Sequence, residues 1–180
     1  MRSLAAIAVT LSAVLVMAPT AAPRPSAKVE SRVTLEAAVV RAMNRVRVAG
    51  GLRPLRTSPG LRAAARGHSR AMLEKGFFAH ESADGTAFSD RIRRYYPSRG
   101  WRTWSVGEAL IASPGSDVEA AAIVDSWLES PPHRAIILSS SWRDAGVGAL
   151  YASAAPKAFG GTATLVVTAD FGLRDRRVDA

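Results

Sequence analysis

The hydrophobic positions of this chain follow a helical period through its first two thirds. From Leu35 to Val46, apolar residues recur three or four positions apart, which places one apolar stripe on a helix. We expect Thr34 to cap the start of this helix and the Gly50-Gly51 pair to end it. A second stripe of the same period, from Leu61 to Met72, predicts another helix.

Capping residues mark the ends of the later helices. Ser58 followed by Pro59 is typical of a helix start, because the first turn tolerates the missing N–H of proline, and Gly76 ends that second helix. A third helix is predicted after Ser116–Glu119, a capping box in which the Ser and Glu side chains each bind a backbone amide. The Pro131-Pro132 pair ends it.

The last third of the chain changes to the pattern of strands. Gly146–Tyr151 and Thr162–Phe171 are β-rich runs joined by a glycine-containing connection, which predicts an antiparallel pair. Before them, Phe88–Tyr95 predicts one or two helical turns and Trp104–Ile111 a short strand. Because helices come first and strands gather late, the fold class is α+β rather than alternating βαβ.

Composition limits the chain to one ordinary domain with a strong positive charge. It has 180 residues, 48% of them hydrophobic, and 24 Lys+Arg against 15 Asp+Glu give a net charge of +9. Such a surplus favours anionic partners, which include nucleic acid, phospholipid headgroups and acidic wall polymers. The arginines are scattered rather than gathered in one run, which makes nucleic acid an unfavourable candidate.

The chain contains no cysteine. Disulfide scaffolds, thiolate metal sites, cysteine nucleophiles and a lipid-modified N-terminal cysteine are therefore excluded. The sequence also lacks a phosphate-binding glycine loop, a Gly-x-Ser-x-Gly elbow and a helix with two histidines four apart. Histidine, carboxylate and serine side chains remain to carry any site chemistry.

The N-terminus has the pattern of an export signal. Arg2 precedes the uncharged apolar run Leu4–Met17, and small residues follow up to Ala22. The run is shorter than the about 20 residues that span a bilayer, so we predict a signal peptide over 1–22, with an uncleaved anchor as the alternative. We expect a linker over 23–33, one domain over 34–174 and a tail over 175–180. The processed chain then has no transmembrane segment and is secreted or associated with the cell envelope.

The three histidines differ in their surroundings. His68 lies on the apolar stripe of the second predicted helix and is expected in the core. His80 stands between the aromatic pair Phe77-Phe78 and a polar loop. His133 follows the proline pair and can point from a helix end into a cleft.

Several short segments occur in an order that is more specific than any one of them. In chain order they are Asn44-Arg45, Gly51–Leu55, Leu61 with Ala65 and His68, Phe78–His80, Asp84-Gly85, Arg91, Gly107-Glu108, Trp127–Arg134, Ile137-Leu138, Gly146–Gly148 and Asp170–Gly172. Together they resemble the family of cysteine-rich secretory proteins, antigen 5 and pathogenesis-related plant proteins, the CAP or SCP-like superfamily. The likeness is greatest to its bacterial, cysteine-free branch.

This resemblance implies a three-layer α-β-α sandwich with a small antiparallel sheet, and a cleft where two histidines and up to two glutamates converge. His80 and His133 match the histidines, and Glu108 matches one glutamate. The second glutamate is expected where this chain has Ser130. Glu129 is one position early, about 100° around a helix, so its membership of the cleft is in question.

Two kinds of site are compatible with these residues. Neutral imidazoles and a carboxylate suit a divalent cation such as zinc, with His80, His133 and Glu108 as ligands and a vacant position for water. Without a metal, the same side chains can form a hydrogen-bonded polar group that orders the cleft. No residue stands out as a nucleophile, so no catalytic residue is assigned.

Two functions follow. The favoured hypothesis is a secreted or envelope-associated binding module whose cleft takes a lipid, a glycan, a peptide or protein, or an anionic envelope polymer. The alternative is a metal-dependent extracellular hydrolase acting on peptides, with Glu108 as a ligand or general base.

Overall fold

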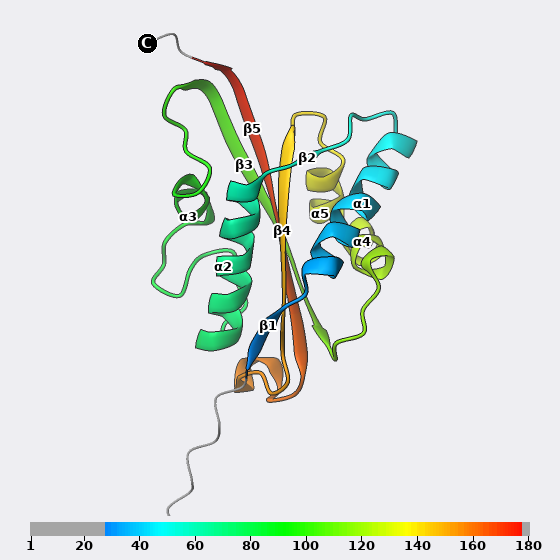
Figure 1. Ribbon diagram of the computed structural model, residues 1–180, viewed down its shortest axis with the longest axis vertical. Coiled ribbons are helices and arrows are strands. Elements are labelled where there is room, and N and C mark those ends of the chain that lie inside the picture. The colour runs from blue at the N-terminus through cyan, green and yellow to red at the C-terminus, as the bar shows by residue number, and fades with distance from the viewer. Residues whose placement is uncertain (1–27, 178–180) are drawn as a thin grey trace, which may run out of the picture.

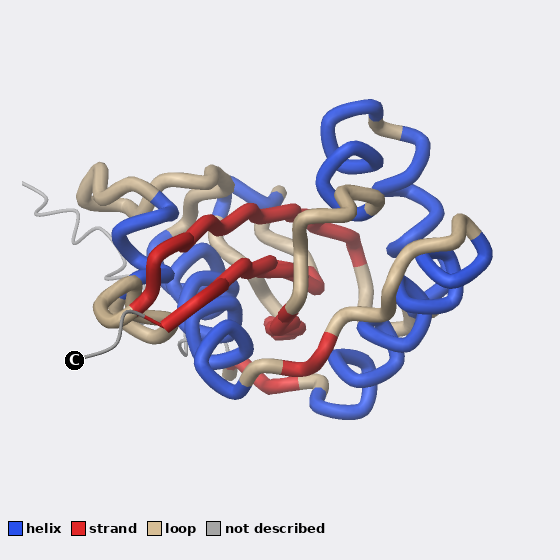
Figure 2. Tube along the Cα trace, turned by 90° about the horizontal axis from the view of Figure 1, so that it is seen from above, coloured by secondary structure: helices blue, strands red, loops and turns tan. Residues whose placement is uncertain are grey.

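The computed structural model describes residues 28–177 and has three layers. Figure 2 shows the strands lying between two groups of helices. One face of the sheet is covered by α1 (Val33–Ala49), α4 (Ala120–Glu129) and α5 (Pro131–Ile137), and the other by α2 (Pro59–Lys75) and α3 (Phe88–Arg93). The α+β class and the α-β-α sandwich are therefore confirmed.

The central sheet runs in the order β1-β4-β5-β3, and β2 pairs with β4 beside it. Its strands are β1 (Val29–Ser31), β2 (Arg56–Thr57), β3 (Trp101–Pro114), β4 (Asp144–Ala152) and β5 (Thr164–Arg177). All pairings are antiparallel except that of β2 with β4. A 3-10 turn, η1 (Lys157–Phe159), lies in the connection between β4 and β5 (Figure 1). These two strands are the antiparallel pair that the sequence pattern predicts.

The main apolar core fills the space between the sheet and α1, α4 and α5. Trp127 of α4 is 1% exposed, and its indole N–H donates to the carbonyl of Leu110 at 3.0 Å. Alternate residues of β5 face this core, from Leu165 to Phe171, as the two-residue period of a strand requires. Burial of the predicted apolar stripe of α4 is thereby confirmed.

On the opposite face, α2 packs unusually close to β4. A Cβ atom added to Gly146 would lie 2.0 Å from the amide nitrogen of Arg62, and one on Gly148 would lie 2.2 Å from that of Arg66. Any side chain at either position would have to displace the helix backbone. The two glycines are thus what allows α2 to lie directly on the strand.

The helix ends agree with the sequence pattern in α2 and differ in α1 and α4. Ser58 caps α2 and Gly76 ends it in a left-handed conformation, as predicted. The predictions for the other two helix starts are wrong. Arg32 rather than Thr34 occupies the N-cap position of α1, without a hydrogen bond from its side chain. The Ser116 hydroxyl donates to Asp117 rather than binding an amide of α4. Pro131 both follows α4 and begins the additional helix α5.

The predicted linker over 23–33 requires correction in its described part. Residues Val29–Ser31 form β1, which pairs with β4 as a regular antiparallel edge, and α1 already begins at Val33. Apolar and polar residues alternate over Val29–Ser31, a pattern that an edge strand and a linker can share, so the sequence did not distinguish them. The predicted signal peptide over 1–22 lies outside the described residues. Within residues 28–177, no helix is both long enough and apolar enough to cross a bilayer.

Candidate functional site

The candidate site is built around Glu108, near the middle of the edge strand β3. Ala109 faces the core under α1, α4 and α5, so alternation along the strand turns Glu108 to the face covered by α2 and α3, where its side chain is 1% exposed. A carboxylate at such a depth needs partners that replace water. The chain supplies them from the segment between α2 and α3 and from α3 itself.

His80 and Arg91 bind the two oxygens of Glu108. The Nδ1–H of His80 donates to Oε1 at 2.8 Å, and an Nη2–H of Arg91 donates to Oε2. Arg91 also donates through Nη1 to the backbone carbonyl of His80 at 2.8 Å. The three side chains therefore form a closed cycle that fixes the loop carrying His80.

This cycle sets the charge of His80 and its orientation. Its hydrogen bond to Glu108 raises the pKa of His80 above the ordinary histidine value, and partial burial opposes that effect. Because Nδ1 faces the carboxylate, the other ring nitrogen, Nε2, points away from it. The side chain remains 46% exposed, so this outer edge of the ring is accessible from solvent.

His133 approaches from the other group of helices. It lies in the first turn of α5, which packs against β3, and it is half-buried. Burial lowers the pKa of His133, and the charge on His80 lowers it further. His133 makes no side-chain hydrogen bond to Glu108 or His80 among the described residues, so the influence of His80 on its pKa is electrostatic.

His68 is buried, as the sequence indicates, but it also supports the site. Its Nε2–H donates to the carbonyl of Ala79 at 2.9 Å, directly before His80, and its ring contacts Phe77 edge-on. Burial lowers the pKa of His68. The neutral form is therefore favoured, and it anchors the start of the loop.

Two other carboxylates have contrasting positions. Glu129 is exposed at the end of α4 and makes no hydrogen bond or ion pair within residues 28–177, so the structure does not bring it into the cluster. Asp170 of β5, which sequence reasoning did not select, lies fully buried opposite Glu108. Its signal was a charged residue, Asp170, two positions after Thr168 within the mainly apolar run Leu165–Phe171.

A model of the family of cysteine-rich secretory proteins, CAP, matches residues 40–171. The chain belongs to the CAP family. It does so without a single cysteine. The CAP resemblance read from the ordered segments is therefore confirmed.

Several known proteins share parts of this CAP domain. An uncharacterized membrane protein of Bacillus subtilis, YlbC, is 30% identical over 115 residues, which cover 64% of this chain and 31% of that protein. An outer surface protein of Borrelia burgdorferi has a TM-score of 0.65 at 19% identity, covering 83% of this chain and 99% of its own. An extracellular SCP-domain protein of Bacillus anthracis has a TM-score of 0.61 at 22% identity, covering 79% and 41%. The chain thus spans about a third of the Bacillus subtilis relative, and the two solved structures establish the shared fold.

A divalent cation, as the sequence suggests, would need several donors placed around one point. Among residues 28–177, no three histidine, aspartate or glutamate side chains are placed to share one ion. Both oxygens of Glu108 are already bound by protein donors, and one of these donors is the Arg91 cation. The arrangement of His80, Glu108 and His133 therefore does not fit a three-ligand metal centre.

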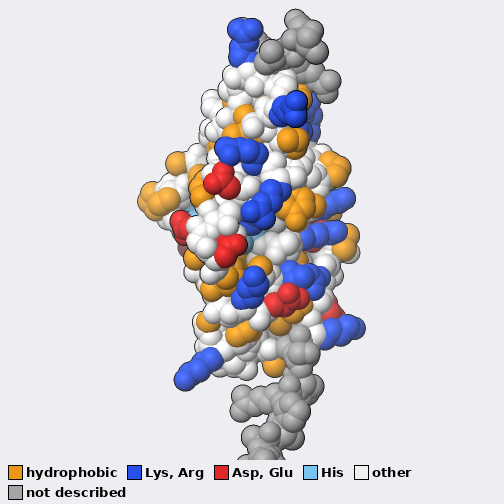
Figure 3. All heavy atoms as spheres, turned by 90° about the vertical axis from the view of Figure 1, so that its left-hand side faces the viewer, with side chains coloured by type: hydrophobic (Ala, Val, Ile, Leu, Met, Phe, Trp, Pro, Cys, Tyr) orange, Lys and Arg blue, Asp and Glu red, His pale blue; other side chains and the backbone are white. Residues whose placement is uncertain are grey.

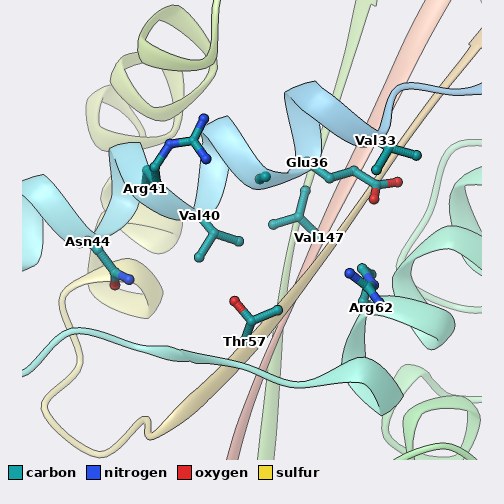
Figure 4. Close-up of a pocket in the computed structure, with 9 residues that line it drawn as sticks. Val33, Glu36, Val40, Arg41, Asn44, Thr57, Arg62 and Val147 are labelled. Carbon is teal, nitrogen blue, oxygen red and sulfur yellow. The ribbon is translucent and has the colours of Figure 1, made fainter.

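A separate hollow of about 380 Å³ lies at the opposite edge of the sheet, between α1 and the start of α2. Figure 4 shows Val40 of α1 and Thr57 of β2 pointing toward one another, with Val147 of β4 nearby. Glu36 at its wall is bound by Arg66 at 2.5 Å. None of His80, Glu108 and His133 lines this hollow, so it is distinct from the histidine site.

Proposed function

We propose that this CAP domain is an extracellular or envelope-associated binding module, and that it takes an anionic group of its ligand at the site of His80 and His133. The observation that carries the proposal is the exposed imidazole of His80, whose inner nitrogen is held by the buried Glu108. The outer nitrogen is thereby oriented toward solvent as a donor. A carboxylate or phosphate is the complementary partner.

The charge of the surroundings supports an anionic ligand. The raised pKa of His80 favours its cationic form, and the chain carries a net charge of +9. Lys and Arg side chains are spread along the face that carries α2 and α3 (Figure 3). Their summed field attracts anions, while the single oriented donor at His80 supplies direction.

Binding is favoured over metal-dependent hydrolysis by the occupation of Glu108. A general base must be free to accept a proton, yet both Glu108 oxygens accept hydrogen bonds from His80 and Arg91. Zinc titration followed by calorimetry tests the alternative directly. Stoichiometric binding that is lost in both His80→Ala and His133→Ala would favour the hydrolase.

The binding proposal is tested by NMR titration with inorganic phosphate, acetate and a short acidic peptide. We expect ring signals of His80 and His133 to shift together and saturate, and His80→Ala to weaken the strongest-binding probe about tenfold, the effect of losing one charge-assisted hydrogen bond. Glu129→Gln removes an exposed charge outside the cluster and serves as the control. Equal weakening in both variants would contradict an oriented site.

Export of the chain is a second part of the proposal. It is supported by the apolar run Leu4–Met17 with the small residues that follow it, and by the similarity to extracellular and outer-surface proteins. Mass spectrometry of the extracellular fraction should find an N-terminus between about Thr20 and Lys28. Recovery of only the untrimmed chain inside the cell would contradict export.

A further inference from the structure

Two carboxyl groups face each other inside the molecule, one at the centre of the candidate site and one that the proposed function does not use. Glu108 of β3 is paired in register with Asp170 of β5, and their side chains share the face under α2 and α3. Glu108 is 2% exposed and Asp170 is 0% exposed. Directly opposed side chains on antiparallel strands have Cβ atoms about 5 Å apart, within reach of a carboxyl–carboxyl hydrogen bond.

The hydrogen bonds are distributed unequally between the two groups. Glu108 receives donors from His80 and Arg91, whereas neither oxygen of Asp170 has a donor among the described residues. An ionised carboxylate that is fully buried without donors is strongly destabilising. Ionised Asp170 would therefore be the unstable member of the pair.

The groups around Asp170 supply no second positive charge for it. Arg91 from α3 is committed to Glu108 and to the His80 carbonyl, and β4 offers only Gly146 at the paired position. His68 from α2 is buried and donates to Ala79, and its Nδ1 has no partner within the described residues. The Nδ1–H of His80 is committed to Oε1 of Glu108.

Burial and the facing charge of Glu108 raise the pKa of Asp170 well above the ordinary value, against the opposing effect of Arg91. A hydrogen bond between the two carboxyl groups would act in the same direction. Such a bond needs one proton between them, because two carboxylates have no hydrogen to donate. Two carboxyl groups at this separation share a proton in other buried pairs.

We propose that Asp170 is a protonated positioning residue, whose hydroxyl donates to Glu108 and holds that carboxylate toward His80 and Arg91. The pair then carries one negative charge, which Arg91 and His80 balance within the chain. The inference concerns the same site as the proposed function, but its test needs no ligand, so the two can fail separately.

The first test uses the wild-type chain with the aspartate carboxyl carbons labelled with ¹³C. We expect one aspartate signal, absent in Asp170→Asn, to keep the chemical shift of a protonated carboxyl group at about pH 7, where ordinary aspartates are ionised. A carboxylate shift for Asp170 at that pH would overturn the proposal. If Asp170→Asn does not fold, isotope-edited infrared difference spectra of the wild-type chain, with and without the ¹³C label, replace the comparison and show whether a protonated aspartate carboxyl group is present at that pH.

The second test separates positioning from simple charge by following the ring signals of His80 through a pH titration. Asp170→Asn keeps a neutral donor for Glu108, so the titration midpoint of His80 should stay at the wild-type value. Glu108→Gln removes the charge itself and should move that midpoint down. Thr168→Val, two residues from Asp170 on the same face, controls for disturbed packing. If Asp170→Asn lowers the midpoint as Glu108→Gln does, Asp170 is an anion in the native protein and the proposal is wrong.

Discussion

The two faces of β5 differ sharply although they alternate along one strand. Toward α1, α4 and α5 the strand presents Leu165, Val167, Ala169 and Phe171, and that side is an apolar core. Toward α2 and α3 it presents Thr168 and Asp170, which meet polar groups of neighbouring elements. The first face derives its stability from packing, whereas the second needs every polar group to find its partner. In this molecule the candidate site belongs to the second face.

The largest expected effect lies in the apolar core. Trp127→Ala should lower the free energy of unfolding by about 3 to 5 kcal/mol, because it removes a 1% exposed indole from the packed interior. Denaturant melts of the purified variants measure this. Glu119→Ala at the exposed start of α4 makes no side-chain cap and should change the stability by less than about 0.5 kcal/mol. Comparable losses in both variants would contradict the packing of α4.

A smaller loss is expected on the polar face. The hydroxyl of Ser69 donates to the carbonyl of Gly148 at 2.9 Å and shares a hydrogen bond with Thr168 at 2.8 Å. Ser69→Ala leaves these buried groups without a partner and should cost about 1 to 3 kcal/mol in the same melts. Ser105→Ala on the exposed part of β3 is the control, with less than about 0.5 kcal/mol expected. A neutral Ser69→Ala would mean that the polar face tolerates unpaired groups.

The apolar face was predictable from the sequence because its signals are local. The stripes of α1 and α4 and the alternation of β5 each depend on neighbouring residues. The local pattern was nevertheless misleading at the start of α4, where a neighbouring side chain competes for the predicted capping residue. The Ser116 hydroxyl binds the Asp117 carboxylate at 3.0 Å, so the capping box does not form.

The site was predictable only in part, because its assembly depends on strand register. His80, Glu108 and His133 were selected from an ordered resemblance, and the structure joins the first two directly. The role of Arg91 and the place of Asp170 depend on the pairing of β3 with β5 across about sixty residues of chain. The spacing of apolar residues within one segment does not reveal which residues of two distant strands will be paired. Glu129 was in question from helix geometry alone, and it lies outside the cluster.

A double-mutant cycle sharpens the comparison at the level of single contacts. His80→Ala removes the donor of one 2.8 Å hydrogen bond, and Glu108→Gln removes the charge of its acceptor, so their effects on unfolding should be non-additive by more than about 0.5 kcal/mol. No hydrogen bond joins His80 and His133 among the described residues, so their coupling should be smaller. Trp127 and His80 lie on opposite faces of the sheet, so the effects of Trp127→Ala and His80→Ala on the free energy of unfolding should be additive. Strict additivity for His80 and Glu108 would mean that the site does not form in solution.

The smallest effect is a difference in pH dependence between the exposed and the buried histidine. Since the folded state raises the pKa of His80, its stabilising effect is complete below the ordinary histidine pKa and is lost as the pH rises through the folded-state pKa. The opposite holds for His68, whose pKa is lowered by burial: its contribution is complete above the ordinary value and is lost as the pH falls.

Unfolding free energies of His80→Gln and His68→Gln, each referred to the wild type at about pH 5.5 and about pH 8.5, measure both trends. The loss caused by His80→Gln should be larger at the lower pH, and the loss caused by His68→Gln should be larger at the higher pH. Parallel trends in the two variants would show that the polar face does not distinguish its two histidines, and that the cycle of His80, Glu108 and Arg91 does not set the charge of the site.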